Sequence, residues 1–174
     1  MAKVDLLNAK GRAYFLFYNL DQAVGKGCPN RKDDVLLAQY LMVGASQKVP
    51  GLIGLYPGGG MGWDVDGIWD NEWDGVLDYY QSEWKKRGPK TWPDRRIDPV
   101  PSHTWKASPI HHVQYFIMTL NMLFGDLRPQ DFPRLSEAKD CPAELRPFIR
   151  VYWISDVWAK WLPNAQASTP GAIP

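Results

Sequence analysis

Residues 66–81 read DGIWDNEWDGVLDYYQ (Asp66–Gln81) and predict a tight turn that leads into a helix. The opening Asp-Gly dipeptide is typical of turns, because glycine adopts a positive φ at little cost. Asp70 or Asn71 can cap the helix, and two acidic residues follow in its first turn. The apolar residues recur at helical spacing, at Trp73, Val76, Leu77, Tyr80 and Trp84. We therefore expect one buried helix face, with Gln81 beside it and able to bond a neighbouring backbone.

An earlier helix is predicted over about residues 32–43. Asn30 or Asp33 can cap this helix, and Gly44 is expected to end it. Five residues are expected on its inner face: Val35, Leu36, Gln39, Met42 and Val43. Residues 49–64, between the two helices, contain two prolines and a glycine triplet, so we expect a loop there. A loop of this length in a compact domain is usually functional or flexible.

Three segments, taken in order, resemble the motifs of the peptidoglycan-binding-domain-like family. Asp34–Met42 (DVLLAQYLM) is similar to its Asp-Val-x-x-Leu-Gln-x-x-Leu motif, with Ala38 and Met42 at leucine positions. Residues 66–81 resemble its motif that begins Asp-Gly-Ile-aromatic and ends aromatic-Gln. Residues 94–99 (DRRIDP) resemble a further Asp-Gly motif, with arginine in place of the glycine.

The resemblance covers residues from about 27 to 99 and implies a three-helix module of the kind found beside cell-wall enzymes. Two positions depart from the family, which usually has glycine where Asp70 stands and threonine where Trp73 stands. The resemblance also implies a ligand groove around the Asp66 turn and the two matching helices. The candidate ligand-binding residues are Tyr56, Trp63, Asp66, Trp69 and Gln81. Tyr56 and Trp63 lie in the long loop, where aromatic rings could cover the core or stack on a sugar.

The remaining segments add to this core. Ala13–Leu20 (AYFLFYNL) is rich in aromatic residues and favours a strand or an extended segment. Residues 110–124 predict a third helix, closed by Gly125. Residues 143–162 predict one or two more helices, and the C-terminal tail that follows is expected to be extended. Three tryptophans would cover a wide arc of the last helix, which suggests contact with another body: Trp153, Trp158 and Trp161.

Together these expectations describe a mainly α single domain with long Gly/Pro loops and an added helical part. Its parts are an N-terminal aromatic segment packed on the core (1–26), the peptidoglycan-binding-like core (27–101), a C-terminal helical extension (102–162) and the tail (163–174). The chain has 174 residues, 45% of them hydrophobic, which is enough for a real core. Fifteen glycines and fifteen prolines fit many turns between short elements.

Charge and sequence patterns limit the cellular compartments and the kinds of partner that the chain is expected to have. The formal charge is +1, so no overall field favours nucleic acid or an acidic membrane. The basic run at residues 85–87 falls at a helix end, where cations complement the helix dipole. No Sec signal and no apolar run of ~18 residues occurs. We therefore expect synthesis in the cytoplasm and, for action outside it, a non-Sec route to a virion or the cell envelope.

Catalytic and metal-binding patterns are missing from the sequence. The three histidines show no zinc-ligand spacing: His103, His111 and His112. Cys28 and Cys141 belong to no CxxC pair and are expected as free thiols, with one long-range disulfide as the alternative. The glycine-rich loop at residues 25–30 lacks the phosphate-binding pattern and is expected to be structural. Glu72, Asp74 and Glu83 qualify as catalytic carboxylates by residue type alone. We expect that the chain is not an enzyme and that it binds no cofactor and no metal.

Two functions remain, from different classes. The ordered motifs, the nine tryptophans and the aromatic loop favour a non-catalytic module that binds bacterial cell-wall peptidoglycan. The alternative is a structural or adaptor protein of a phage virion or contractile injection-type assembly. It is favoured by the lack of a catalytic domain and of a signal peptide, and by the aromatic C-terminal half. A cytoplasmic protein that uses the same fold to bind another protein is a third possibility.

Overall fold

The computed structural model describes residues 2–9, 13–46, 49, 64–87, 93–101 and 115–149. This part of the chain is rich in helix, which confirms the mainly α class expected from the sequence. The elements in chain order are β1 (Lys3–Ala9), β2 (Ala13–Asn19), β3 (Val24–Gly25), α1 (Lys32–Ala45), α2 (Asn71–Lys86), β4 (Arg96–Ile97), α3 (Phe116–Leu127), the 3-10 helix η3 (Leu135–Glu137) and α4 (Arg146–Ile149).

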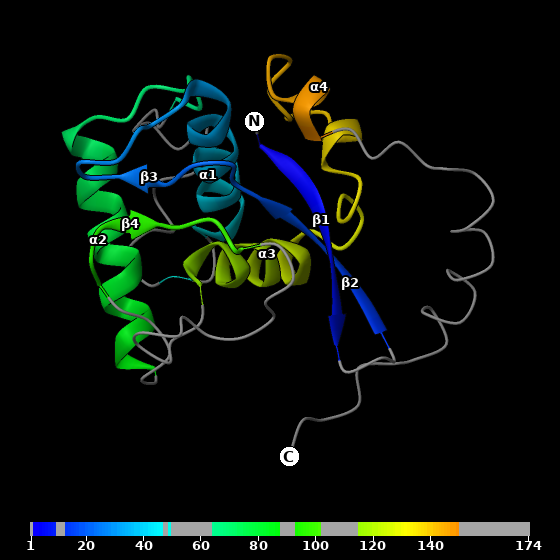
Figure 1. The fold of residues 1–174 in the computed structure, drawn as a ribbon, viewed down its shortest axis with the longest axis horizontal. Helices are drawn as coiled ribbons and strands as arrows, with labels where there is room; N and C mark the ends of the chain where they lie inside the picture. Colours follow the sequence, from blue (N-terminus) through cyan, green and yellow to red (C-terminus); the bar gives the residue numbers. More distant parts are fainter. Residues whose placement is uncertain are drawn as a thin grey trace.

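The strands form two small antiparallel sheets. β1 pairs with β2 in a register that runs from Lys3↔Asn19 to Ala9↔Ala13, and this hairpin extends away from the helices (Figure 1). β3 pairs with β4 over two residues on each strand. The strand expected after Gly11 is therefore confirmed, whereas β1 was not predicted from the sequence. β1 depends on pairing with β2, and its own residues carry no clear period.

Helix α1 lies at the centre of the fold and is buried on nearly all sides. Neither Asn30 nor Asp33 caps it, so that expectation is wrong: Arg31 occupies the cap position and makes no side-chain cap bond. Asn30 instead adopts a φ of +49° and bonds Gly25, which makes the glycine-rich loop structural, as expected. Gly44 does not end the helix either; α1 continues to Ala45.

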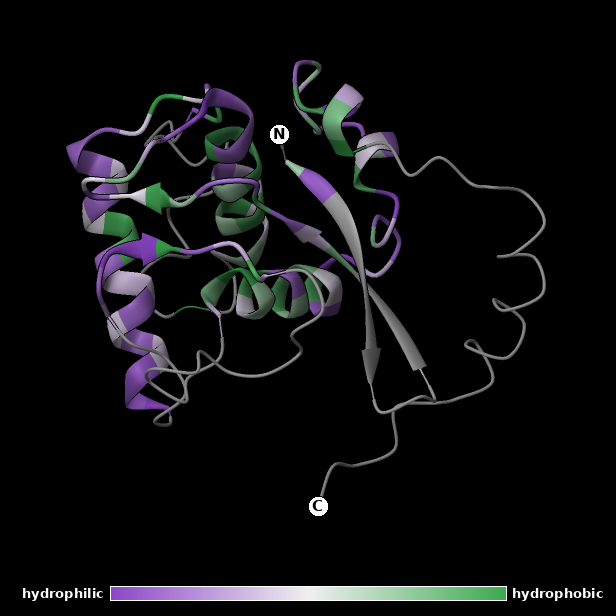
Figure 2. Cartoon of the chain, viewed as in Figure 1, coloured by the Kyte–Doolittle hydropathy of each residue, from purple (hydrophilic) through white to green (hydrophobic). Residues whose placement is uncertain are grey.

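Helix α2 begins as the sequence predicts. Asp70 is its N-cap, and its carboxylate accepts hydrogen bonds from the backbone N–H groups of Glu72 (3.0 Å) and Trp73 (2.9 Å). The predicted apolar stripe is confirmed: four of its members are buried, and Trp84 packs against the core while half-exposed. In Figure 2 hydrophobic residues follow α1 and α3, whereas much of α2 is hydrophilic. α2 therefore buries one stripe and leaves the rest to solvent.

Helix α3 packs against α1 and ends later than expected. It runs through Gly125 to Leu127, so glycine does not terminate it. The helix begins at Phe116, after a non-helical Tyr115, so the expected continuous helix from residue 110 is wrong; residues 110–114 themselves lie outside the described residues. The helices approach each other closely at Gly44, where an added Cβ would lie 2.2 Å from the Phe124 ring. Glycine is required at this position because the ring occupies the space of a side chain.

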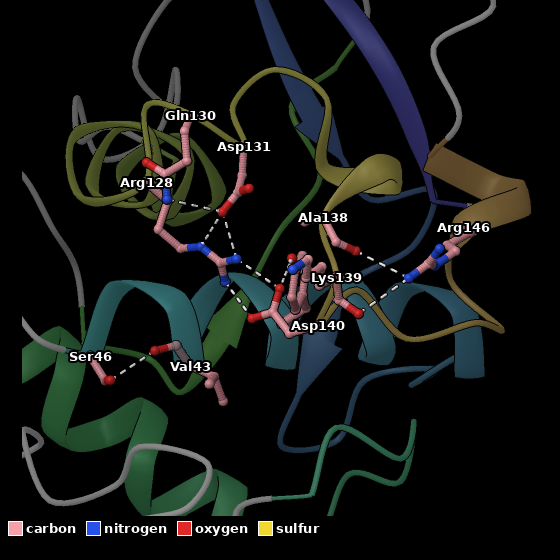
Figure 3. A network of polar contacts seen from close by, with 10 residues as sticks. Val43, Ser46, Arg128, Gln130, Asp131, Ala138, Lys139, Asp140 and Arg146 are labelled. Atoms are coloured by element: carbon pink, nitrogen blue, oxygen red, sulfur yellow. Dashed lines mark hydrogen bonds and ion pairs between the residues drawn. The ribbon is translucent and has the colours of Figure 1, made fainter.

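The chain after α3 turns back through a cis Phe132–Pro133 peptide and η3 into the short helix α4. Arg128 fastens this return to the helices, as Figure 3 shows: its guanidinium lies between Asp131 (2.6 Å) and Asp140 (2.6 Å). Arg128 also stacks 5.0 Å from the centre of the Phe124 ring. The predicted helix beyond residue 149, its three tryptophans and the tail all lie outside the described residues.

A single hydrophobic cluster joins the described parts from residue 2 to residue 149. The hairpin contributes Phe17 and Tyr18 from its inner end, and both are fully buried. The largest fully buried side chains of the whole cluster are Tyr18, Tyr80, Phe17, Phe124, Leu20, Leu37, Leu41, Met42, Leu77, Ile97, Ile117 and Leu120. The N-terminal segment and the segment after residue 115 thus share one core with the two central helices.

Buried side-chain amides connect distant segments of this core. Asn121 accepts from the backbone N–H of Tyr18 (2.7 Å) and donates to its C=O (2.9 Å). Asn19 bonds Val100 in the same way: its Oδ1 accepts from the backbone N–H of Val100 (2.9 Å), and its Nδ2 donates to the C=O (2.8 Å). We call this arrangement, a side-chain amide bonded to both a backbone N–H and a backbone C=O, an amide clasp. Each clasp provides hydrogen-bond partners for a backbone N–H and a backbone C=O in the core.

Candidate functional site

The turn after Asp66 is held by an amide clasp from α1. Gln39 is fully buried; its Oε1 accepts from the N–H of Gly67 (2.9 Å), and its Nε2 donates to the C=O of Ile68 (2.9 Å). The same Nε2 lies 3.2 Å from Asp66 Oδ1, which also accepts from the N–H of Ile68 (2.8 Å). The helix thereby fixes the backbone of the turn.

The turn after Asp94 repeats this arrangement with a glutamine from α2. Gln81 Oε1 accepts from the N–H of Arg95 (2.8 Å), and Nε2 donates to the C=O of Arg96 (2.8 Å). Asp94 Oδ1 lies 3.3 Å from Gln81 Nε2 and accepts from the N–H of Arg96 (3.0 Å). The four bonds correspond atom for atom to those of the first turn. The fold therefore contains two copies of a helix-glutamine-turn unit.

Both turns place their second residue at positive φ. Gly67 has a φ of +79°, and Arg95 has a φ of +58°. Glycine is needed in the first turn for space as well, because an added Cβ would lie 2.6 Å from Lys32 Cγ. Arg95 adopts the left-handed conformation although it is not a glycine, which strains the backbone. Its guanidinium forms an exposed ion pair with Asp78 (3.0 Å).

Three of the predicted ligand-binding residues lie in or beside these turns. Asp66 is exposed, with one carboxylate oxygen engaged in the first turn. Trp69 is half-buried; its Nε1 donates to Asp74 Oδ1 (2.7 Å), and its ring lies 6.1 Å from that of Trp73. Gln81 is buried, and its amide is used within the fold at the second turn. The other two predicted residues, Tyr56 and Trp63, lie outside the described residues.

The first turn also presents a residue that was not predicted from the sequence as a ligand contact. The Ile68 side chain is 63% exposed, the highest value among the exposed large hydrophobic residues of the described chain. It stands between Asp66 and Trp69 on a backbone that the Gln39 clasp holds in place. Its signal in the sequence was its position directly after the Asp-Gly dipeptide, where the turn carries it outwards.

The stretch of chain around Ile68 is acidic. Four exposed carboxylates lie within a few residues of it in the chain: Asp64, Asp66, Asp70 and Glu72. Residues 64–84 contain seven acidic residues and no lysine or arginine. The surface around the first turn, here the Ile68 surface (Asp66, Ile68 and Trp69), thus combines apolar area with hydrogen-bond acceptors. Such a surface can bind a ligand that is partly apolar and carries hydrogen-bond donors.

The two thiols are free in the structure, as the sequence predicted. Burial raises the pKa of Cys141 to about 11 and also raises the pKa of Cys28. Both thiols are therefore protonated near neutral pH, which makes them poor nucleophiles. Within the described ranges, no group of three or more His, Cys, Asp or Glu residues could hold a metal ion. None of the helices in those ranges is long and apolar enough to cross a membrane.

Asp140 gives the fold a defined dependence on pH. The hydrogen bonds from Arg128 lower the pKa of Asp140 from its ordinary value of 3.8. The stabilisation is therefore present above that value and is lost as the pH falls through the lower pKa of the folded state. An Asp140→Asn variant should be destabilised near pH ~7, and the deficit should be smaller at a pH below 3.8, where the Asp140 carboxyl begins to take up a proton.

Urea denaturation of both proteins at the two pH values measures this change. Glu137→Gln is the control, because Glu137 is exposed and its ion pair with Arg134 is long, at 3.9 Å. Its effect should be small at both pH values. A deficit for Asp140→Asn that stays constant with pH would contradict the assignment to the ionised carboxylate.

Comparisons with known proteins add no relative: no protein-family model, curated protein or solved structure matches the chain.

Proposed function

We propose that the chain is a non-catalytic binding module that recognises bacterial cell-wall peptidoglycan through the Ile68 surface. The observation that supports this most is the repeated helix-glutamine-turn unit. Its residues are those of the motifs that resemble the peptidoglycan-binding-domain-like family, in the same order. Because Gln39 fixes the first turn, the Ile68 surface is preorganised, which lowers the entropy cost of binding.

The proposal assigns different roles to the predicted residues. Ile68 and Trp69 supply apolar and aromatic area, and the free acceptor capacity of Asp66 suits the amide and hydroxyl groups of a glycopeptide. Gln81 acts through the second turn, since its amide bonds stay inside the fold. Tyr56 and Trp63 remain candidate contacts from the sequence alone, because both lie outside the described residues.

The test is co-sedimentation of the purified protein with insoluble peptidoglycan sacculi. Ile68→Ser should weaken binding about tenfold, because an exposed isoleucine that becomes buried against a ligand contributes about 1.5 kcal/mol or more. The matched control is Met122→Ser on α3, whose side chain is 50% exposed in the free protein. Both variants should unfold close to the wild type. The proposal fails if the wild type does not bind sacculi, or if both variants bind equally well.

A structural or adaptor role in a phage virion or contractile injection-type assembly is the second candidate. It is favoured by the apolar, tryptophan-rich sequence of residues 151–162, which suits contact with another protein. Absence of binding to sacculi, together with particles larger than a monomer in light scattering, would favour this role over the first.

A further inference from the structure

The first turn contains the dipeptide Asp66–Gly67, whose backbone can change without an enzyme. In an Asp-Gly pair the glycine nitrogen can attack the side-chain carboxyl carbon of the aspartate, because glycine has no Cβ to hinder the approach. The nitrogen–carbon bond forms while the carboxyl loses its OH and the nitrogen its proton, together as water. Water then reopens the ring, and its attack at the main-chain carbonyl leaves isoaspartate, which has an extra carbon in the main chain and an unchanged mass.

Two Asp-Gly pairs occur in the sequence, and they lie in different surroundings. Asp74–Gly75 lies inside α2, where the helix holds the backbone. Asp66–Gly67 lies in the turn before that helix, and Asp66 is exposed, so water reaches its carboxyl group. The helix therefore protects the second pair, whereas the first pair depends on other contacts.

The Gln39 clasp holds both groups that would react. The Gly67 N–H, whose proton leaves when the ring closes, donates to Gln39 Oε1 (2.9 Å). Asp66 Oδ1, on the carbon that is attacked, lies 3.2 Å from Gln39 Nε2 and accepts from the N–H of Ile68 (2.8 Å). Within the ring the Gly67 nitrogen carries no hydrogen, so its bond to Gln39 has to break before the ring can close. The clasp thus opposes the reaction directly.

Packing adds to this restraint, because the clasped turn has little room to move. A Cβ added at Gly67 would lie 2.6 Å from Lys32 Cγ and 3.1 Å from Leu36 Cγ, so the backbone of the turn lies directly against α1. Gln39 is itself fully buried on the same helix. The turn can therefore change its backbone only by leaving α1.

We propose that Asp66 is a site of isoaspartate formation and that the Gln39 clasp keeps this reaction slow. The reaction becomes fast when the turn leaves the clasp, through substitution or local unfolding. The extra main-chain carbon lies directly before Gly67, so isomerisation displaces Ile68 and Trp69 from their places. The clasp therefore also preserves the Ile68 surface. This chemistry belongs to the turn itself and is independent of the proposed ligand.

Incubation of purified variants in neutral buffer, followed by peptide mapping, tests the proposal. Isoaspartate is detected as a peptide of unchanged mass that elutes apart from its parent, resists a protease specific for aspartate and accepts a methyl group from a protein isoaspartyl methyltransferase. Gln39→Met should form isoaspartate at position 66 at least about tenfold faster than the wild type, the factor that corresponds to one lost hydrogen bond. The wild type unfolded in guanidinium gives the rate without any clasp.

Gln81→Met is the matched control, because it removes the clasp of the second turn, which has the same bonds, and leaves the first intact. Its rate at Asp66 should stay close to that of the wild type although its stability falls as well. Asp66→Glu in the Gln39→Met background should abolish the signal, because the longer side chain does not readily close the ring. Equal rates at Asp66 in Gln39→Met and Gln81→Met would overturn the proposal.

The wild type alone keeps the test decisive if Gln39→Met does not fold. Guanidinium below the unfolding transition should speed isomerisation at Asp66 before Asp74, because opening the turn exposes the first pair whereas the second needs α2 to unfold. Isomerisation that rises at both pairs together would overturn the proposal. Isomerisation of Asp66 in the folded wild type at the rate of the unfolded chain would overturn it as well.

Discussion

A Gln39→Met variant is expected to lose about 3 kcal/mol of unfolding free energy, because methionine fills the volume but cannot form the clasp. The N–H of Gly67 and the C=O of Ile68 would each lose the partner they have in the fold. A part-buried backbone group without a partner costs about 1–3 kcal/mol, and here two groups are affected. Chemical denaturation of the wild type and the variant measures the difference.

Three companion variants make this prediction specific. Gln81→Met should cost a similar amount, since its clasp has the same bonds. Gln130→Met changes an exposed glutamine and should stay within about 0.5 kcal/mol of the wild type. Gln39→Glu puts a carboxylate oxygen against the C=O of Ile68, so its deficit should decrease when acid protonates it. A loss below about 1 kcal/mol for Gln39→Met would show that water replaces the clasp.

The second large effect is expected for Gly44→Ala, which should destabilise the protein by about 2–3 kcal/mol. The new Cβ would lie 2.2 Å from a ring carbon of Phe124, and this ring is fully buried and unable to move into solvent. Alanine is favoured over glycine in a helix interior by about 1 kcal/mol, but the overlap outweighs that gain. Thermal and chemical denaturation both report the change.

Gly75→Ala is the matched control for this substitution. Gly75 also lies inside a helix, α2, but an added Cβ there meets nothing within 4 Å. This variant should therefore be stabilised by about 0.5–1 kcal/mol. Combining Gly44→Ala with Phe124→Leu should recover part of the loss, because the smaller side chain frees the space. Equal effects of the two glycine substitutions would mean that α1 and α3 are further apart than described.

The features that were predicted correctly from the sequence are those that depend on residues close together in the chain. The Asp70 cap and the buried stripe of α2 were correct because both follow from local spacing. The ends of α1 and α3 were wrong because Gly44 and Gly125 stand where a helix usually stops. At Gly44 the glycine is required by packing and does not end the helix, because the Phe124 ring fills the space of a side chain. A glycine can mark a close contact as well as a helix end.

The candidate site was predictable only in part, for a related reason. The motifs indicated that Gln81 would bond a neighbouring backbone, which it does. They gave no sign that Gln39 does the same for the first turn, because its partners lie 28 and 29 residues away. The exposure of Ile68 follows from that distant clasp. β1 was missed likewise, since its partner strand defines it.

The clasps also bear on the order in which the chain folds. The Gln81 clasp joins residues 14 and 15 positions apart, whereas the Asn121 clasp joins residues 103 positions apart. Closing the longer loop costs more chain entropy, by about 0.6 kcal/mol for each doubling of length. On the ribosome, β2 emerges early but cannot be anchored until Asn121 has been made. The β1–β2 hairpin must therefore wait through most of synthesis before its place in the core exists, and it is most open to aggregation during this interval.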